Sequence, residues 1–218
     1  MSNHLSGKEV IANGAYMDIS RSRLDLVVLR HMARKLYMAL QSLDPSAVTA
    51  LPLIYSSEER RSREHRIVIF NYQELLLNRS LTFVGFISGR QEAIDPTVAS
   101  EIPRADDQLL TELVKTPGVL SYSSLELRKD SWYNLVLLRD ATIREHVKGS
   151  TTHAYAAYQL APLYYEWVRL HHGILPNGLA QGDMQLQSTR YYTFHVRPHE
   201  PIIIERSYEV HDVVHLVS

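Results

Sequence analysis

The side chains with the greatest potential for chemistry lie between Arg139 and Gly173, where aromatic and histidine residues gather. His153 stands there in the segment STTHAYA, and a histidine can act as a base near neutral pH. Tyr155, Tyr158 and Tyr165 follow at spacings of three and seven, which would place them on one face of a helix. Such rings and hydroxyl groups are typical of a site for a planar apolar molecule.

A second part of the candidate site is expected on the strand before this stretch. In WYNLVLLR, Trp132 and Asn134 alternate with Tyr133, so they should share one side of a sheet and line a cavity with the tyrosines. The predicted site consists of the catalytic residues His153 and Asn134 and the substrate-binding residues Trp132, Tyr155, Tyr158 and Tyr165. The alternative is a tyrosine-rich core, in which case the chain is a non-catalytic ligand-binding or interaction module.

Several other reaction classes lack their residues in this sequence. The chain has no cysteine, which excludes disulfides, thiolate zinc sites and cysteine nucleophiles. The motifs of the nucleophile elbow, the phosphate-binding loop and the dinucleotide-binding turn are all missing. His171 and His172 would point about 100° apart on a helix, so they are not expected to share an ion. We therefore expect no metal site and no nucleotide cofactor.

Composition and charge are those of an ordinary globular protein. The 218 residues are 45% hydrophobic and 22% charged. A net charge of -1 gives no overall basic field, so nucleic acid is not an expected partner. The sequence contains neither the pattern of a signal peptide nor an apolar run long enough to cross a membrane. We expect a cytoplasmic protein with no membrane contact.

The first element expected to support the site is an amphipathic helix. Between Ser22 and Leu43 apolar residues recur every three or four positions, which predicts a helix of several turns. Its apolar seam should pack on the protein's own sheet, with a dimer contact as the alternative. The charged run 56–66 predicts a solvated loop, and residues 90–104 predict a second one. We divide the chain into an N-terminal arm and helix, residues 1–60, and a second domain, residues 61–218.

The sequence pattern of the second domain predicts an α+β fold with the element order β-α-β-β-α-β. A strand around His65 to Tyr72 precedes this unit, and Gly85 within the unit's first strand suggests either a bulge or a close approach by another group. The unit itself comprises a strand from Ser80 to Ser88, a helix from Asp106, a hairpin of Val119 to Leu127 with Trp132 to Arg139, the long helix interrupted at Pro162, and a strand from Gln185 to Val196. This is the ferredoxin-like arrangement, with both helices on one face of the sheet. The apolar segment from Pro201 onward should add a strand to this sheet or to a partner's.

The segments TPGVLSY, WYNLVLLRD, STTHAYA and APLYYEWVRLHHG resemble the dimeric α/β-barrel proteins related to antibiotic biosynthesis monooxygenases. The resemblance covers about residues 80 to 197. It implies a homodimer whose two sheets face each other to form a barrel, with a pocket between each sheet and its helices. It also implies monooxygenase-like activity on a small aromatic molecule without a cofactor. The sheet face without helices would carry Phe83, Leu135 and Leu137 and would be buried by the partner.

Other members of this family bind and degrade haem through a histidine on the second helix. His153 occupies the matching place in this sequence. However, Ile143 stands where those members have a tryptophan, and the strand from Leu81 to Ser88 has no asparagine. The resemblance therefore leaves a haem-binding protein, with haem held by His153, as an alternative only.

Overall fold

The computed structural model describes residues 3–5, 18–44, 46, 48, 50–60, 62–128, 131–194 and 201–209. Its strands are β1 (Asn3–Leu5), β2 (Leu53–Glu59), β3 (Arg63–Ile69), β4 (Leu81–Arg90), β5 (Val119–Arg128), β6 (Ser131–Leu138), β7 (Tyr165–Leu175), β8 (Gln185–Thr193) and β9 (Ile202–Ser207). They form one sheet in the order β1-β9-β8-β7-β4-β6-β5-β3-β2. Neighbouring strands within the described residues are antiparallel, apart from the parallel pair β1 and β9.

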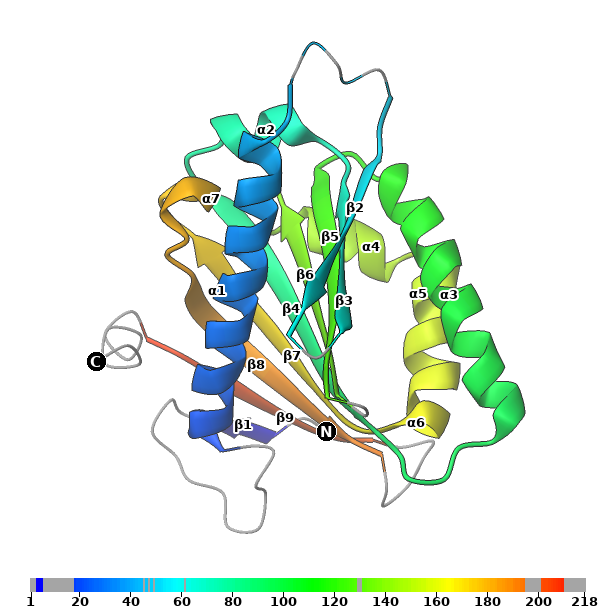
Figure 1. The fold of residues 1–218 in the computed structure, drawn as a ribbon. Coiled ribbons are helices and arrows are strands. Elements are labelled where there is room, and N and C mark those ends of the chain that lie inside the picture. Colours follow the sequence, from blue (N-terminus) through cyan, green and yellow to red (C-terminus); the bar gives the residue numbers. More distant parts are fainter. Residues whose placement is uncertain are drawn as a thin grey trace.

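Helices cover both faces of this sheet (Figure 1). The helices are α1 (Ile19–Gln41), α2 (Tyr72–Leu77), α3 (Pro96–Val114), α4 (Ile143–Lys148), α5 (Thr151–Tyr155), the π-helical η3 (Ala156–Leu160), α6 (Ala161–Tyr164) and α7 (Gly178–Gln181). Helix α1 lies on one face, and α3 to α6 lie on the other. None of the described helices is long and apolar enough to span a membrane. The protein is therefore of the α+β class.

The predicted amphipathic helix is confirmed as α1. It begins after Asp18, whose side chain accepts a hydrogen bond from the backbone N–H of Ser20 at 2.9 Å. Its apolar seam, with Leu29 and Leu36 at its centre, is fully buried in the largest core of the protein. The seam packs on the protein's own sheet, as expected. At Gly85 on β4, a Cβ atom would lie 2.6 Å from Leu29 Cδ1, so the predicted close approach is also confirmed.

The prediction of an uncovered sheet face is wrong, because α1 occupies that face. Phe83, Leu135 and Leu137 are 0%, 1% and 0% exposed and belong to the same core as the α1 seam. The apolar area that was assigned to a partner is thus covered within the chain. A homodimer stays a prediction, and it would have to use a different surface from the one expected.

The order β-α-β-β-α-β occurs between Leu81 and Leu175, but it ends with a different strand from the one predicted. Its strands are β4, β5, β6 and β7, and they lie side by side in the order β7-β4-β6-β5. The helix predicted through Gly173 already ends at Tyr164, and β7 begins at Tyr165. Because β7 pairs with β4 on one side and β8 on the other, long-range pairing overrides the local helical pattern. The strand predicted at Gln185 to Val196 is β8 (Gln185–Thr193), an additional strand of the same sheet, while residues 195 and 196 lie outside the described residues.

Two predicted loops are regular structure instead. Residues 56–66 lie largely in the β2–β3 hairpin, where charged side chains are tolerated because β2 is an edge strand. The proposed boundary at residue 60 falls in the turn of this hairpin. Helix α3 begins at Pro96, capped by Asp95, because proline is well tolerated in a first helical turn. The expected C-terminal strand is confirmed as β9 on the protein's own sheet, while residues 210–218 lie outside the described residues.

Candidate functional site

The predicted site lies on the side of the sheet that faces α3 to α6. On β6, Trp132 and Asn134 share this side, while Tyr133 and Leu135 belong to the α1 core, which confirms the predicted alternation. Asn134 is paired in register with Phe86 of β4. On the α1 side, Phe83 and Leu135 of these strands are fully buried, but on the other side Trp132, Asn134 and Phe86 are only half-buried. The helices thus leave the centre of this side accessible to solvent.

A carboxylate on α3 binds a tyrosine hydroxyl and a guanidinium group on this side. Asp106 accepts hydrogen bonds from the Tyr122 hydroxyl and from Arg66 Nη2, each at 2.8 Å. Tyr165 lies edge-on to Phe86, with ring centroids 5.5 Å apart. Burial, followed by the neighbouring Tyr164 and the charge of Asp106, raises the pKa of Tyr165 above its usual range. The Tyr165 hydroxyl is therefore protonated at neutral pH and can donate a hydrogen bond.

His153 stands in the first turn of α5. Its backbone N–H donates to the Ser150 hydroxyl at 3.0 Å, which confirms the expected cap. The imidazole is half-buried. Burial lowers the pKa of His153, Lys148 lowers it further, and Glu112 acts in the opposite direction. A neutral imidazole at pH 7 can accept a proton, as a general base must.

Several buried polar atoms on this side of the sheet have no hydrogen-bond partner in the structure. They include Oδ1 of Asn134, Nδ1 of His153 and Oε2 of Glu112. Glu112 accepts a hydrogen bond from the Thr152 hydroxyl through its other carboxylate oxygen. A buried polar atom without a partner costs on the order of 1–3 kcal/mol. Bound water or the polar groups of a ligand would supply the missing hydrogen bonds.

The predicted tyrosine face is not formed. Tyr165 belongs to β7, and the π-helical turn η3 changes the phase of the helix beyond α5. Tyr155 and Tyr158 are 37% and 78% exposed, so their side chains lie at the surface. Contact of these two tyrosines with a substrate stays a prediction. Trp132, Asn134 and Tyr165 do share one side of the sheet. The helices that cover this side include α5, which carries His153.

Sequence reasoning missed a polar network buried between α1 and the sheet. Asp25, on the buried side of α1, accepts hydrogen bonds from Tyr133 Oη at 2.8 Å, from Arg169 Nε at 2.6 Å and from Arg169 Nη2 at 2.9 Å. His171 Nε2 lies 3.0 Å from the same carboxylate, and His171 Nδ1 lies 2.7 Å from Thr189 Oγ1. The strand alternation of Arg169 and His171 would have indicated a shared face, but these residues were assigned to a helix.

Burial opposes the ionisation of Asp25, but hydrogen bonds from His171 and Arg169 outweigh it and lower the pKa of Asp25. The network is thus an ion pair with its hydrogen bonds satisfied. Such a group fixes the position of α1. The Asp25 carboxylate oxygens already accept hydrogen bonds, so they are not available to bind a substrate. His172, the neighbour of His171, points to the opposite side of β7, because residues alternate along a strand.

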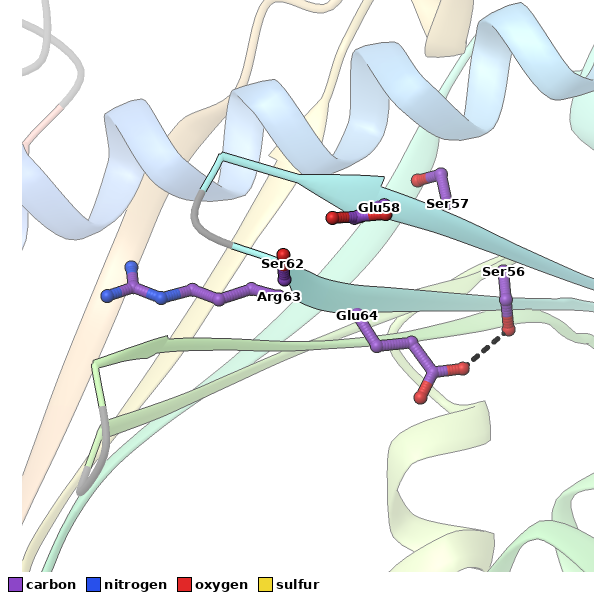
Figure 2. A pocket seen from close by; sticks show the side chains of 6 residues that line it. All are labelled: Ser56, Ser57, Glu58, Ser62, Arg63 and Glu64. Carbon is purple, nitrogen blue, oxygen red and sulfur yellow. Dashed lines mark hydrogen bonds between the residues drawn. The ribbon is translucent and has the colours of Figure 1, made fainter.

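A hollow of about 370 Å³ lies on the β2–β3 hairpin (Figure 2). It is lined by Ser56, Ser57, Glu58, Ser62, Arg63 and Glu64. The Ser56 hydroxyl donates to Glu64 at 2.7 Å, so part of this lining is already paired. None of the predicted site residues contributes to this hollow. Within the described residues, no group of three or more metal-ligating side chains is arranged to hold an ion.

No family model matches the sequence, and no curated protein matches it. Protein SO0527 from Shewanella oneidensis is similar over 45% of this chain and 95% of its own, with 12% identity and a TM-score of 0.36. SnoaB, a cofactor-independent oxygenase from Streptomyces nogalater, is similar over 45% of this chain and 92% of its own, with 16% identity and a TM-score of 0.33. The likeness is too low to transfer an activity.

Proposed function

We propose that the protein binds a small planar aromatic molecule between the sheet and helices α3 to α6 and oxidises it in the manner of a cofactor-independent monooxygenase. The observation that carries this proposal is the pair of unpartnered buried atoms, Asn134 Oδ1 and His153 Nδ1. Asn134 lies on the side of the sheet that carries the half-buried rings of Trp132, Phe86 and Tyr165, and His153 lies on α5, in the helix layer that covers this side. Aromatic surface together with a few polar groups is the usual composition of a small-molecule site.

Each group has a role in this proposal. The rings of Trp132 and Phe86 provide a flat apolar surface for the substrate. Asn134 Oδ1 accepts a hydrogen bond from a substrate hydroxyl, and the protonated Tyr165 donates one. These contacts fix the orientation of the substrate, while the neutral His153 imidazole takes a proton from it.

Removal of a proton from an activated methylene group would leave an electron-rich carbanion. The carbanion can reduce molecular oxygen, so that one oxygen atom forms a C=O bond at the former methylene carbon and the other leaves as water with the two hydrogen atoms. The substrate supplies all the electrons in this step, and no external reductant is needed. The role of the protein is to position the substrate and to accept the proton.

We also propose that residues 81–175 form a ferredoxin-like unit, to which α1 and the outer strands are joined. The strand order β7-β4-β6-β5 and the location of α3 to α6 on one face support this assignment. In a two-subunit barrel the opposite face would meet a second sheet. In this chain α1 takes that position, so the proposed site belongs to a single chain.

Non-catalytic ligand binding is the second candidate function. It is favoured by the separation of the two predicted catalytic residues, since no hydrogen bond within the described residues joins His153 to Asn134. Oxygen consumption with an anthrone-type probe distinguishes the two functions, because a binding module would take up the probe without consuming oxygen.

The haem alternative finds little support at His153. The charged side chains of Lys148 and Glu112 influence this imidazole, and Thr152 adds a hydroxyl group that binds Glu112. A haem macrocycle needs broad apolar surfaces on both sides of its ring, which these neighbours do not supply. We therefore derive no step through haem. An absorbance spectrum of the purified protein with and without added haem tests this conclusion.

We expect an aromatic ligand to quench the fluorescence of only one of the two tryptophans. Trp132 lies on the proposed ligand side, while Trp167 packs against the α1 core and under the Arg169 guanidinium. In a Trp167→Phe variant, titration with an anthrone-type probe should quench the emission with a saturable curve. In the matched Trp132→Phe variant the saturable change should be lost. Equal quenching in both variants would contradict the proposed location.

Replacement of His153 by alanine should lower the oxidation rate at least about 100-fold, the usual contribution of a general base. The change should cost less than about 1 kcal/mol of unfolding free energy, because the imidazole is only half-buried. His146→Ala provides the control, since His146 is an exposed histidine on the neighbouring helix α4. Oxygen uptake and chemical denaturation measure the two effects. An unchanged rate would exclude His153 as the general base. A large loss of stability would make it a structural residue.

A further inference from the structure

We propose that the aromatic ligand carries a carboxylate group, and that this group binds beside His172 and Arg190. The inference rests on the proposed function, because it names the substrate class of the same site. Its basis is a row of side chains across the sheet. Asn134 pairs with Phe86, Phe86 with Leu170, and Leu170 with Arg190, so these four residues follow one another on one side of four adjacent strands.

The length of this row suits a planar molecule with a polar group at each end. Adjacent strands are about 4.8 Å apart, so Asn134 and Arg190 are separated by about 14 Å at the backbone. Phe86 and Leu170 form the apolar middle of the row. The unpartnered carbonyl of Asn134 stands at one end and a guanidinium group stands at the other. A ligand along this row would meet a hydrogen-bond acceptor first and a cation last.

His172 supplies a buried donor beside the cationic end. Its side chain is on the same side of β7 as Leu170 and is 4% exposed. Nδ1 lies 3.4 Å from the Ser188 hydroxyl, and Nε2 is buried without a partner. With Nδ1 accepting from Ser188, Nε2 carries the proton and can donate to an anion. In this tautomer the missing partner of His172 is a hydrogen-bond acceptor.

The charges around His172 define the type of acceptor. Burial, followed by the positive charges of Arg144, Lys148 and Arg190, lowers the pKa of His172 to about 3. Three cations are therefore close enough to influence this neutral imidazole. Arg144 and Lys148 both pair with Glu145, which is 61% exposed, and Arg190 pairs with Glu205 at 3.0 Å.

The two pairs with Glu145 are exposed, and such ion pairs are weak and can be exchanged for a ligand. The pair of Arg190 with Glu205 is more buried, since the Glu205 side chain is 15% exposed. A carboxylate would accept a hydrogen bond from the imidazole N–H and would also be attracted by the cations. An uncharged substituent would form only the hydrogen bond. Lys148 also lowers the pKa of His153, so its charge influences both histidines. A carboxylate near Lys148 would reduce this effect and make His153 a stronger base in the complex.

The test compares two probes of the same shape, naphthoate and the matching naphthylmethanol, by quenching of Trp132 in the Trp167→Phe variant. Naphthoate should bind at least about tenfold more tightly than the alcohol. Raising the ionic strength from about 0.01 M to about 1 M shortens the screening length from about 30 Å to about 3 Å, so it should weaken naphthoate binding specifically. Lys148→Gln and Arg190→Gln should each remove most of the preference. Lys35→Gln, which removes one positive charge from α1 on the other face, should leave it unchanged.

Two other outcomes would overturn the inference in different ways. If the alcohol binds as tightly as naphthoate, the carboxylate preference is refuted, while the aromatic site of the proposed function stands. If neither probe quenches Trp132, both the inference and the proposed function fail. A preference that survives Lys148→Gln and Arg190→Gln together would place the anion elsewhere and would also refute the assignment.

Discussion

Asp25→Ala is expected to lower the free energy of unfolding by about 3–5 kcal/mol, the usual cost of removing one partner from a buried ion pair. Asp25 is 1% exposed, and the carboxylate binds Arg169, His171 and Tyr133. Without it, the 4%-exposed Arg169 and the buried His171 both lose the carboxylate that they contact in this network. Chemical denaturation followed by circular dichroism measures the loss.

A matched control is Asp107→Ala, which removes an exposed carboxylate from α3. Such surface changes usually stay within about 0.5 kcal/mol. Asp25→Asn should fall nearer to the alanine variant than to the control, because it keeps the shape of the side chain but not the charge. If Asp25→Ala proved as stable as the control, the network would not anchor α1.

Stability is also expected to decrease as the pH falls from about 6.5 to about 4. Burial lowers the pKa of His65 from 6.5 to about 4, with Glu59 acting in the opposite direction. Between these values the unfolded chain binds the proton and the folded chain does not, so acid favours unfolding. The contribution is fully present above pH 6.5 and reaches up to about 3 kcal/mol. His172, with a pKa of about 3, should add to the decrease in the same direction.

The variant His65→Leu separates this contribution from the rest. His65 is fully buried, and neither ring nitrogen forms a hydrogen bond, although Nδ1 lies 3.6 Å from Glu59 Oε1. Since the imidazole is neutral at pH 7.5, an apolar side chain of similar size should cost little stability there. Denaturation midpoints measured across the range should then depend less on pH than those of the unmodified protein. An identical pH dependence in both proteins would show that His65 titrates normally.

The elements that the sequence predicted well are those with a clear local pattern. The leucine seam between Ser22 and Leu43 and the hairpin of β5 and β6 both have a strong period and clear end signals. The element that was mistaken, Tyr165–Leu175, has no such signal. It follows a helical segment directly, and it becomes a strand because β4 and β8 pair with it on both sides. Pairing partners of this kind cannot be identified from local periodicity.

In the candidate site, likewise, only the arrangement that depends on local strand alternation was predicted correctly. Trp132 and Asn134 needed only the alternation of one strand, and the structure places them as expected. The grouping of Tyr155 and Tyr158 with Tyr165 assumed one uninterrupted helix, which the π-helical turn and β7 exclude. Asp25 was missed because its partners come from other elements. Arg169, for example, is 144 residues away in the sequence.

The position of α1 has a consequence for the order in which the chain can acquire its structure. During synthesis α1 is complete long before Arg169 and His171, which are 144 and 146 residues downstream of Asp25. Ser22 on the same helix pairs with Tyr208, which is 186 residues away. Contacts of such high sequence separation form slowly, because a long loop must close before they contribute. We therefore expect α1 to be an exposed amphipathic helix early in synthesis. The carboxylate of Asp25, which is buried in the folded protein, would stay hydrated until β7 is in place.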